Sequence, residues 1–242
     1  LLNGGTYTQE QLDGAYDAIG AAIKALDDGS GFTSPANLPA SAEIPDVFKF
    51  TEGTAVTADN WANRATEIKA LYDYYMYGPM PDTSAETVSY SISELTDSTR
   101  EITLPDGSKT TVAARTGDMT ITVSRDGKSS SFKVLVALPT TEAPEGGYPV
   151  FTELSASMSF WGMTFPVSIS DNSYYAASRG YASFTYDANE VAVDNSGRTG
   201  AFYTLYPYGN SWREQTGALV AWGWGIGKIL DALENGAAGE LN

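Results

Sequence analysis

The sequence has no histidine and no cysteine among its 242 residues. A Ser-His-Asp/Glu triad needs an imidazole to take the proton of the nucleophile, so this chain cannot complete such a triad alone. The commonest zinc sites use imidazole or thiolate ligands, and a disulfide framework needs cysteine. We therefore expect no metal site and no cofactor in this chain, and no triad built from its own residues.

Basic residues are also scarce. Thirty Asp and Glu residues against fourteen Lys and Arg give a formal net charge of −16, which opposes binding to nucleic acid and to anionic membranes. No apolar run reaches the roughly 18 residues of a membrane span. The first residues lack the basic and apolar pattern of a signal peptide, so we expect a processed or trimmed chain. Its acidity and its many Tyr, Ser, Thr and Gly residues favour an extracellular protein.

The strongest helix pattern covers residues 211–234. Ser211 and Glu214 form a capping box, which predicts that the helix begins there, and Gly236 predicts its end. Glycines interrupt the helix, and each costs about 1 kcal/mol relative to alanine, so we expect close packing against a sheet. The apolar stripe that would face this sheet recurs at three- and four-residue steps and comprises Leu219, Trp222, Ile226, Ile229, Leu230 and Leu233.

Two further helices are predicted nearer the start of the chain, over residues 8–26 and 58–76. Thr8 and Gln11 form a capping box at the first, and Gly78-Pro79 ends the second. The proline-containing segment at 32–56 between them is expected to be extended.

The pattern changes to strict alternation between residues 87 and 138, which predicts several antiparallel strands. Asp126-Gly127 and Pro105-Asp106-Gly107 mark turns between them. Short apolar runs at 149–154 and 181–186 predict inner strands, with a helix around 174–178 between them. This order of elements predicts the α/β class, with a mixed sheet between layers of helices.

A specific spacing of aromatic residues and glycines runs through the chain. It comprises P-D-V-F at 45–48, W-A-N-R at 61–64, R-G-Y-A at 179–182, G-A-F-Y-T-L-Y at 200–206 and G-A-L-V-A-W-G-W-G at 217–225. This pattern resembles the glucuronoyl esterases of carbohydrate esterase family 15. The resemblance implies an αβα sandwich of three layers, of the α/β-hydrolase type and incomplete in this chain, with antiparallel strands at the N-terminal side of a mixed sheet.

The resemblance also implies a division of the chain and an activity. Residues 1–42 would form an N-terminal helix and an extended lead-in, and residues 43–242 the N-terminal portion of a catalytic domain. The family hydrolyses the ester between the 4-O-methyl-glucuronic acid of glucuronoxylan and a lignin alcohol by acyl transfer to serine. The protein would then be a secreted enzyme of lignocellulose degradation.

The family's reactive residues are not in this sequence. Its nucleophilic serine lies in a G-C-S-R-x-G-K turn, followed by the acid and the histidine of the triad, and the resemblance implies that all three lie downstream of Asn242. We therefore expect the chain to be inactive alone. Its expected partners are the glucuronoxylan-lignin ester and the remaining C-terminal half of the same domain.

The loop after the third sheet strand of an α/β-hydrolase contributes to the oxyanion side of the pocket, and the resemblance places that loop at residues 155–161. A second loop, at 205–209, is longer by two residues than the family's usual form. We expect aromatic side chains near these loops to wall the sugar cleft, with a purely structural role as the alternative for each. They are Phe160, Trp161, Phe202, Tyr203 and Tyr208.

Other interpretations stay open. Asp187, Glu190 and Asp194 follow a predicted strand, and glycoside hydrolysis uses paired carboxylates, although thirty acidic residues form such clusters readily by chance. A non-catalytic carbohydrate-binding or scaffolding module is a second alternative, and an esterase for another plant cell-wall ester is a third. Trp222 and Trp224 are expected in the core because they lie in the glycine-rich helix.

Overall fold

The computed structural model describes residues 32–38, 40–41, 44–209 and 215–241. The chain divides into two compact units, Leu1–Met76 and Tyr77–Asn242, and each is described here by itself. The helix predicted at residues 8–26 and the capping residues Ser211 and Glu214 lie outside the described residues. The domain boundary expected at residue 43 stays a prediction.

The first unit contains the helix that was predicted at residues 58–76. A short 3-10 turn, η2 (Ala58–Asn60), leads into α2 (Trp61–Tyr72) and the π-helical turn η3 (Asp73–Tyr77), and a further 3-10 turn, η1 (Pro35–Asn37), precedes them. Arg64 is buried, donates a hydrogen bond to the Val47 carbonyl and forms an ion pair with Glu67. This arginine therefore fixes the segment around Val47 against the helix.

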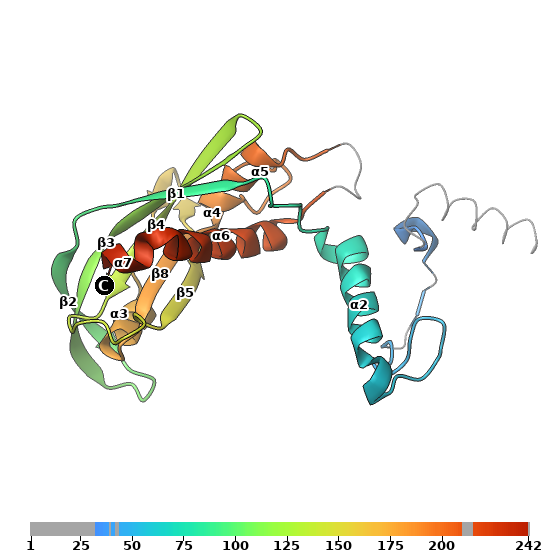
Figure 1. Ribbon diagram of the computed structural model, residues 1–242, viewed down its shortest axis with the longest axis horizontal. Coiled ribbons are helices and arrows are strands. Elements are labelled where there is room, and N and C mark those ends of the chain that lie inside the picture. The colour runs from blue at the N-terminus through green and yellow to red at the C-terminus, as the bar shows by residue number, and fades with distance from the viewer. Residues whose placement is uncertain (1–31, 39, 42–43, 210–214, 242) are drawn as a thin grey trace, which may run out of the picture. The chain divides into compact units, whose positions relative to one another are not determined.

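Six strands of the second unit form one sheet (Figure 1). Its order is β1-β3-β4-β8-β5, and β2 pairs with the first half of the long strand β3. Every pair is antiparallel except β5 with β8. The strands are β1 (Thr87–Ile92), β2 (Thr96–Thr103), β3 (Lys109–Arg125), β4 (Lys128–Leu138), β5 (Val150–Ser155) and β8 (Ala182–Asp187).

The alternation in the sequence correctly predicted these antiparallel strands. Asp126 and Gly127 join β3 to β4 with φ angles of 50° and 74°, the left-handed values that a two-residue type I′ hairpin turn requires. The strand β8 lies inside the sheet, as expected. The strand β5 was also expected to be an inner strand, but within the described residues its one strand neighbour is β8.

Helices cover both faces of the sheet and give three layers, which confirms the expected fold class. Phe184 and Tyr186 of β8 pack on one face against α4 (Ala188–Val191), α5 (Ala201–Leu205) and α6 (Ala218–Ala232). Ser183 and Thr185 point to the other face, where they meet α3 (Asp171–Ser178). After α6 the chain continues through η5 (Leu233–Ala237) into α7 (Ala238–Leu241).

The helix α6 begins later than its sequence pattern predicted. The predicted start was residue 211, whereas residues 215–217 are not helical and Gly217 is the N-cap. The reason is a close approach of two backbones, because the Gly217 N–H donates to the Tyr77 carbonyl at 2.7 Å. Gly236 marks a kink with φ of 120°, after which the helical chain resumes.

The buried face of α6 also differs from the predicted stripe. Leu219 and Leu230 are 58% and 43% exposed, whereas Trp224 and Ile229 are buried. Apart from Lys228, small residues form the rest of the buried face, since α6 lies so near the sheet that a Cβ on Gly225 would come within 3.1 Å of the Tyr186 ring. Close packing was expected and is found. Within the predicted stripe, Ile229 is buried and Trp222, Ile226 and Leu233 pack against the core, so only Leu219 and Leu230 were wrongly expected to face the sheet.

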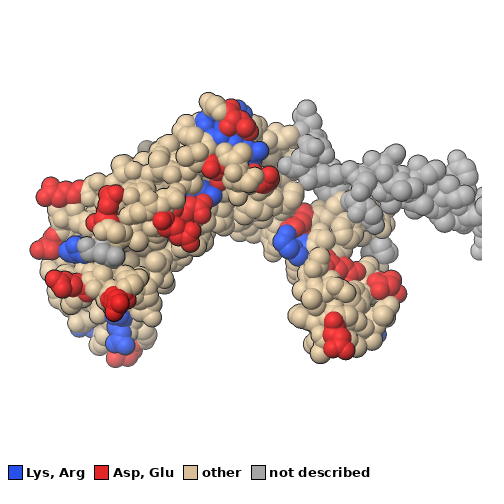
Figure 2. Space-filling view, viewed as in Figure 1, with Lys and Arg blue, Asp and Glu red and all other residues tan. Residues whose placement is uncertain are grey.

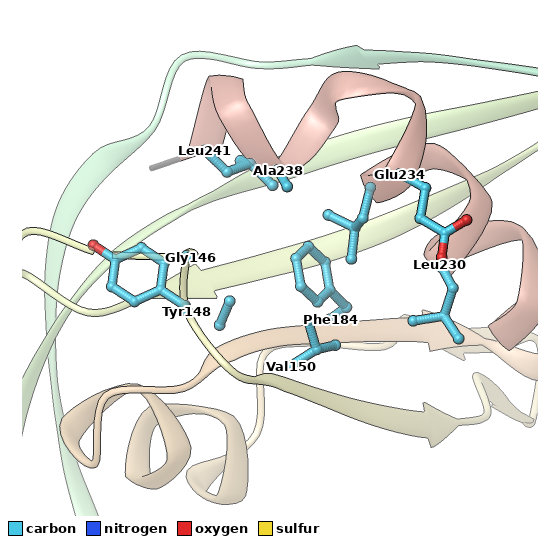
Figure 3. A pocket seen from close by; sticks show the side chains of 11 residues that line it. Gly146, Tyr148, Val150, Phe184, Leu230, Glu234, Ala238 and Leu241 are labelled. Carbon is cyan, nitrogen blue, oxygen red and sulfur yellow. The ribbon is translucent and has the colours of Figure 1, made fainter. Parts of the chain in front are cut away.

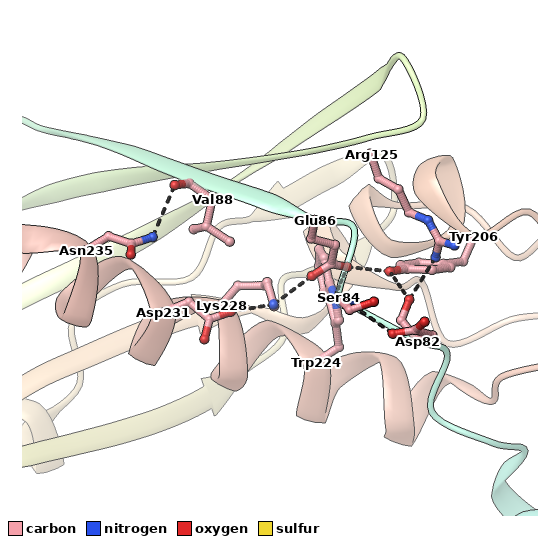
Figure 4. A network of polar contacts seen from close by, with 10 residues as sticks. All are labelled: Asp82, Ser84, Glu86, Val88, Arg125, Tyr206, Trp224, Lys228, Asp231 and Asn235. Carbon is pink, nitrogen blue, oxygen red and sulfur yellow. Dashed lines mark hydrogen bonds and ion pairs between the residues drawn. The ribbon is translucent and has the colours of Figure 1, made fainter.

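A buried carboxylate ties α6 and α5 to the segment before β1 (Figure 4). The Glu86 side chain is 2% exposed and forms an ion pair with Lys228 at 2.7 Å. It also accepts hydrogen bonds from Trp224 Nε1 at 2.8 Å and from the Tyr206 hydroxyl at 2.5 Å. Burial lowers the pKa of Lys228, but the hydrogen bonds that its ammonium group donates to Asp231 and Glu86 outweigh burial, and the net shift of its pKa is upward.

Candidate functional site

The carboxyl ends of the parallel strands β5 and β8 lie at the same edge of the sheet, which is where open α/β sheets bind ligands. A cavity of about 320 Å³ opens beside this edge. Both charged and apolar side chains contribute to it, and its lining comprises Lys133, Leu135, Ser157, Thr164, Pro166, Val167, Thr185, Asp187 and Glu190.

Asp187, the last residue of β8, ties the loop after β5 to this edge. Its Oδ1 atom accepts hydrogen bonds from the Asn189 N–H at 2.9 Å and from the Ser157 N–H at 3.1 Å. Asn189 Nδ2 donates back to the Ser157 carbonyl at 3.0 Å. Two neighbouring strands thus hold the start of the loop in one position.

The charged groups of this cavity already have partners within the protein. Glu190 accepts a hydrogen bond from the Lys133 backbone N–H at 2.7 Å, and Lys133 Nζ forms an ion pair with Asp118 at 2.6 Å. In the part of the chain that the structure describes, no group of three or more Asp and Glu side chains is arranged to hold a metal ion. Asp187 and Glu190 are therefore accounted for by structural roles.

A small hairpin leaves the sheet edge between β5 and α3. It consists of β6 (Met158–Phe160) and β7 (Met163–Phe165), and all six of its strand residues are exposed. Cross-strand pairing places the large apolar side chains on one face and the hydroxyls of Ser159 and Thr164, 3.1 Å apart, on the other. The apolar face consists of Met158, Phe160, Met163 and Phe165, each between 52% and 58% exposed.

Trp161 and Gly162 form the turn of this hairpin with φ angles of 50° and 77°. These are again type I′ values, which are usually met by Asn-Gly or Asp-Gly. A bulky residue with positive φ is an outlier, and Trp161 is 98% exposed, so packing does not explain its place.

A network of hydroxyl groups lies behind the same edge, between the sheet and α3. Ser173 Oγ contacts both Ser183 Oγ and Thr185 Oγ1 at 2.9 Å, and it donates to Glu153 Oε2 at 3.0 Å. Ser170 donates to the same Glu153 atom at 2.6 Å and caps α3. Because these buried serines donate within a carboxylate-centred network, they stabilise α3 rather than supply a nucleophile.

A second concave surface lies at the end of α5. Its cavity of about 270 Å³ is lined in part by Arg125, Tyr206 and Tyr208. The Arg125 guanidinium lies 4.5 Å from the centroid of the Tyr206 ring, and Tyr208 is 38% exposed. Burial and the hydrogen bond to Glu86 raise the pKa of Tyr206 to about 12, so it is protonated at neutral pH.

A third cavity, of about 400 Å³, lies at the opposite end of β5, between that strand and the end of α6 (Figure 3). Phe184 points into it from the sheet and Leu230 from the helix. Val150 of β5 and Leu230 are 42% and 43% exposed. The lining of this cavity is mostly apolar.

Comparison with known proteins connects this topology to an enzyme family. The family model for fungal glucuronyl esterases matches residues 121–242, which include β4, β8 and α6. The chain belongs to the glucuronoyl esterase family. Among curated relatives, the multidomain esterase of Ruminococcus flavefaciens is 41% identical over 220 residues, which are 87% of this chain and 24% of the relative. The 4-O-methyl-glucuronoyl methylesterase 1 of Phanerochaete chrysosporium is 28% identical, over 84% of this chain and 35% of the relative.

Solved structures of the family share the fold. A family 15 glucuronoyl esterase from Caldicellulosiruptor kristjansonii superposes with a TM-score of 0.60 and 37% identity, over 86% of this chain and 49% of that structure. The enzyme of Sporotrichum thermophile, solved with methyl 4-O-methyl-β-D-glucopyranuronate, has a TM-score of 0.54 at 24% identity and shows the fold alone. The chain therefore spans less than half of these family members.

The structure separates the five aromatic residues that were expected to wall a sugar cleft. Phe160 and Trp161 are exposed on the hairpin, and Tyr208 is partly exposed on another surface. Phe202 and Tyr203 are 0% and 5% exposed, so as core residues they present almost no surface to a ligand, which corrects that expectation. Phe202 stacks on Tyr206 instead, and Tyr203 contacts the ring of Tyr208 edge-on.

Sequence reasoning missed the hairpin and the hydroxyl network. The alternation M-S-F and M-T-F on either side of Trp161-Gly162 was a signal for the hairpin, but each strand has only three residues. The serines and threonines of the network are scattered along the sequence, so only the fold brings them to Glu153.

The two tryptophans of α6 were expected in the core. Trp224 is 2% exposed, and the indole N–H of Trp222 donates a hydrogen bond to the Ala192 carbonyl.

Proposed function

We propose that this chain is the N-terminal portion of a catalytic domain that hydrolyses the ester between 4-O-methyl-glucuronic acid of glucuronoxylan and a lignin alcohol. Membership of the glucuronoyl esterase family is the observation that carries the proposal. The relatives are called 4-O-methyl-glucuronoyl methylesterases, and one family structure was solved with a methyl ester of methylglucuronate.

In the described residues β5 pairs with β8 alone, which supports the idea that further sheet strands complete this domain. An edge strand with exposed apolar side chains such as Val150 and Leu154 is a template for pairing with another strand. The cavity beside Leu230 and Phe184 offers room for the apolar side chains of such a strand or of the segment that follows it. We infer that the partner is the remaining half of the same domain.

The proposed chemistry is acyl transfer. A serine hydroxyl attacks the ester carbonyl, a histidine takes its proton, and the alcohol leaves with a proton that the histidine returns. Water, which gives its proton to the same histidine, then attacks the acyl-serine, and the uronic acid leaves as the serine hydroxyl regains that proton. Since the chain has no histidine, these groups belong to sequence that it does not contain. The residues here hold the framework: Asp187 and Asn189 fix the loop after β5, which in α/β-hydrolases contributes to the oxyanion side of the pocket.

The proposed substrate is a cell-wall polymer, so we also propose that the protein is secreted. No helix in the described part of the chain is long and apolar enough to cross a membrane. Acidic side chains are spread over the surface seen in Figure 2, with fewer basic ones among them. Such a surface does not favour nucleic acid as a partner.

The test compares the 242-residue chain with the complete domain that includes it. We expect the complete domain to hydrolyse benzyl glucuronate and to release no acetate from acetylated xylan, and the shorter chain to do neither. Acetate release without glucuronate hydrolysis would show that another cell-wall ester is the substrate. A complete domain that hydrolyses neither ester, and a shorter chain that binds glucuronoxylan, would show a non-catalytic module.

A further inference from the structure

The segment between β5 and α3, residues 156–169, is held at both of its ends by carboxylates of the two parallel strands. We propose that Glu153, near the end of β5, is a positioning residue for the ester hydrolysis, which acts through this segment and not by contact with the substrate. The proposal rests on the proposed function. In α/β-hydrolases the corresponding loop supplies a backbone N–H to the oxyanion, so its position bears on the rate of the reaction.

Asp187 holds the beginning of the segment. It is the register partner of Ser155 across the parallel pair, so β5 and β8 end together. Its Oδ1 atom accepts a hydrogen bond from the Ser157 N–H at 3.1 Å, and Asn189 Nδ2 donates to the Ser157 carbonyl at 3.0 Å. The peptide groups on both sides of Ser157 are thus tied to the end of β8.

Glu153 holds the other end of the segment. Its Oε2 atom accepts hydrogen bonds from Ser170 Oγ at 2.6 Å and from Ser173 Oγ at 3.0 Å. Ser183 Oγ in turn donates to Ser173 Oγ at 2.9 Å, so the proton of the Ser173 hydroxyl is free to point to Glu153. Asn172 Nδ2 makes a longer contact with Oε1 at 3.5 Å. One carboxylate of β5 therefore fixes the first turn of α3.

The segment depends on such outside groups because it has no charged side chain of its own: none occurs from Ser155 to Ser170. Arg100 of β2 adds a further contact by donating to the carbonyl of Ile169, the last residue of the segment. The Ile169 side chain packs against the core cluster that contains Ile102. Contacts with β5 and β2 together therefore determine where the segment meets α3.

The stability of α3 does not by itself require Glu153. Ser170 caps this helix, since its Oγ atom accepts a hydrogen bond from the Ser173 N–H at 3.1 Å. A partly buried carboxylate also loses hydration, and an apolar side chain of similar size would avoid that loss. The carboxylate adds direction instead, because hydrogen bonds to a charged group are short and geometrically specific.

A rate effect follows from the geometry that an oxyanion donor needs. The donor must lie about 2.7–3.1 Å from the position where negative charge develops, and a displacement of about 1 Å costs about 100-fold in rate. This interaction is made in the transition state and not with the bound ester. A segment with one loose end therefore lowers kcat and leaves KM unchanged.

The experiment uses the complete catalytic domain with benzyl glucuronate as the substrate. We expect Glu153→Ala to lower kcat and kcat/KM together by about 10- to 100-fold, with KM unchanged. Glu153→Gln should restore most of the activity, because its amide oxygen accepts from both Ser170 and Ser173.

The matched control is Ser98→Ala. Ser98 of β2 contacts the Tyr174 hydroxyl of α3 at 2.7 Å, so its loss loosens the same helix at a place away from the segment. We expect it to lower the melting temperature and to leave kcat unchanged. If Glu153→Ala does not fold, Ser170→Ala keeps the carboxylate and removes the hydroxyl contact at the end of the segment, and it should lower kcat several-fold with KM unchanged.

Three results would overturn this inference and leave the proposed function intact. They are an unchanged kcat in the folded variant, an equal loss of kcat in Ser98→Ala, and a Glu153→Gln variant as slow as Glu153→Ala. The first shows that the segment keeps its place without Glu153, the second that the helix as a whole matters, and the third that charge matters more than direction. A wild-type domain that does not hydrolyse benzyl glucuronate would instead refute the proposed function, and this inference with it.

Discussion

The β3–β4 and β6–β7 hairpins turn with nearly the same backbone angles but with different residues. Asp126-Gly127 has φ values of 50° and 74°, and Trp161-Gly162 has 50° and 77°. The first turn joins two long strands whose side chains Ile121, Phe132 and Val134 are buried in the core. The second joins two strands of three residues with exposed side chains.

The difference shows that one turn geometry occurs in two hairpins with unequal packing. The β3–β4 hairpin has the favoured turn residues and a packed face, so its local sequence and its tertiary contacts agree. The β6–β7 hairpin has an unfavourable turn residue and an unpacked apolar face. In this hairpin the local preference of the turn residue and the observed backbone therefore disagree.

The largest expected effect comes from breaking the buried network behind the β3–β4 hairpin. Glu86→Ala removes the carboxylate that pairs with Lys228 and accepts from Trp224 and Tyr206. We expect a loss of about 3–5 kcal/mol in the free energy of unfolding, because a buried cation is left with less compensation. Urea denaturation measures the loss. Glu101→Ala breaks the exposed pair with Lys109 and should change stability by less than about 1 kcal/mol.

The next effect concerns the close approach of α6 to the sheet. Gly225→Val adds side-chain atoms where even a Cβ would lie 3.1 Å from the Tyr186 ring, and we expect a loss of about 1–3 kcal/mol. Gly227→Ala on the same helix meets open space and should instead stabilise the protein by up to about 1 kcal/mol. Equal effects of the two substitutions in urea denaturation would contradict the observed packing.

A substitution in the β3–β4 turn sharpens the comparison between the hairpins. Asp126→Trp places tryptophan at the left-handed position of the packed hairpin, and we expect a loss of about 1 kcal/mol in stability. It is the reverse of Trp161→Asn in the exposed hairpin, which should be stabilising. Thermal unfolding of both variants measures whether each substitution lowers or raises the stability. A shift of the same sign in both would show that turn preference does not distinguish the hairpins.

The smallest expected effect is a change in the dependence of stability on pH. The pKa of Tyr206 is raised to about 12 in the folded protein, against about 10 for an unperturbed tyrosine. Between these values the folded state keeps a proton that the unfolded state releases, so stability falls as pH rises from 10 to 12. Tyr206→Phe should make this fall shallower in urea denaturation across that range. An unchanged slope would show that Tyr206 does not contribute to it.

Sequence reasoning predicted the structure correctly where a local residue pattern alone determines it. Period-two alternation predicted β1 to β4, Asp126-Gly127 predicted the hairpin turn, and the aromatic and glycine spacing indicated the esterase family. It failed for the start of α6, because the capping pattern at Ser211 and Glu214 is local, whereas Gly217 donates to the distant Tyr77 carbonyl.

The site residues stay a prediction, and the structure shows only how exposed each of them is. Phe160 and Trp161 were singled out through their place after β5, and the structure leaves both accessible. Phe202 and Tyr203 had the same aromatic character, but they lie in the core. No feature of a single residue distinguishes these cases, since exposure depends on which elements pack over it.

The sequence by itself determined the strands, the turn chemistry and the lack of an imidazole in this chain, because each depends on residue identity or on neighbours a few positions away. Only the tertiary structure decided that Leu219 and Leu230 are exposed and that Gly225 packs against the Tyr186 ring. It also decided that Glu153 accepts hydrogen bonds from the hydroxyls of Ser170 and Ser173, and that the Trp161 side chain is exposed to solvent. These outcomes depend on contacts between segments far apart in the chain, which local pattern does not encode.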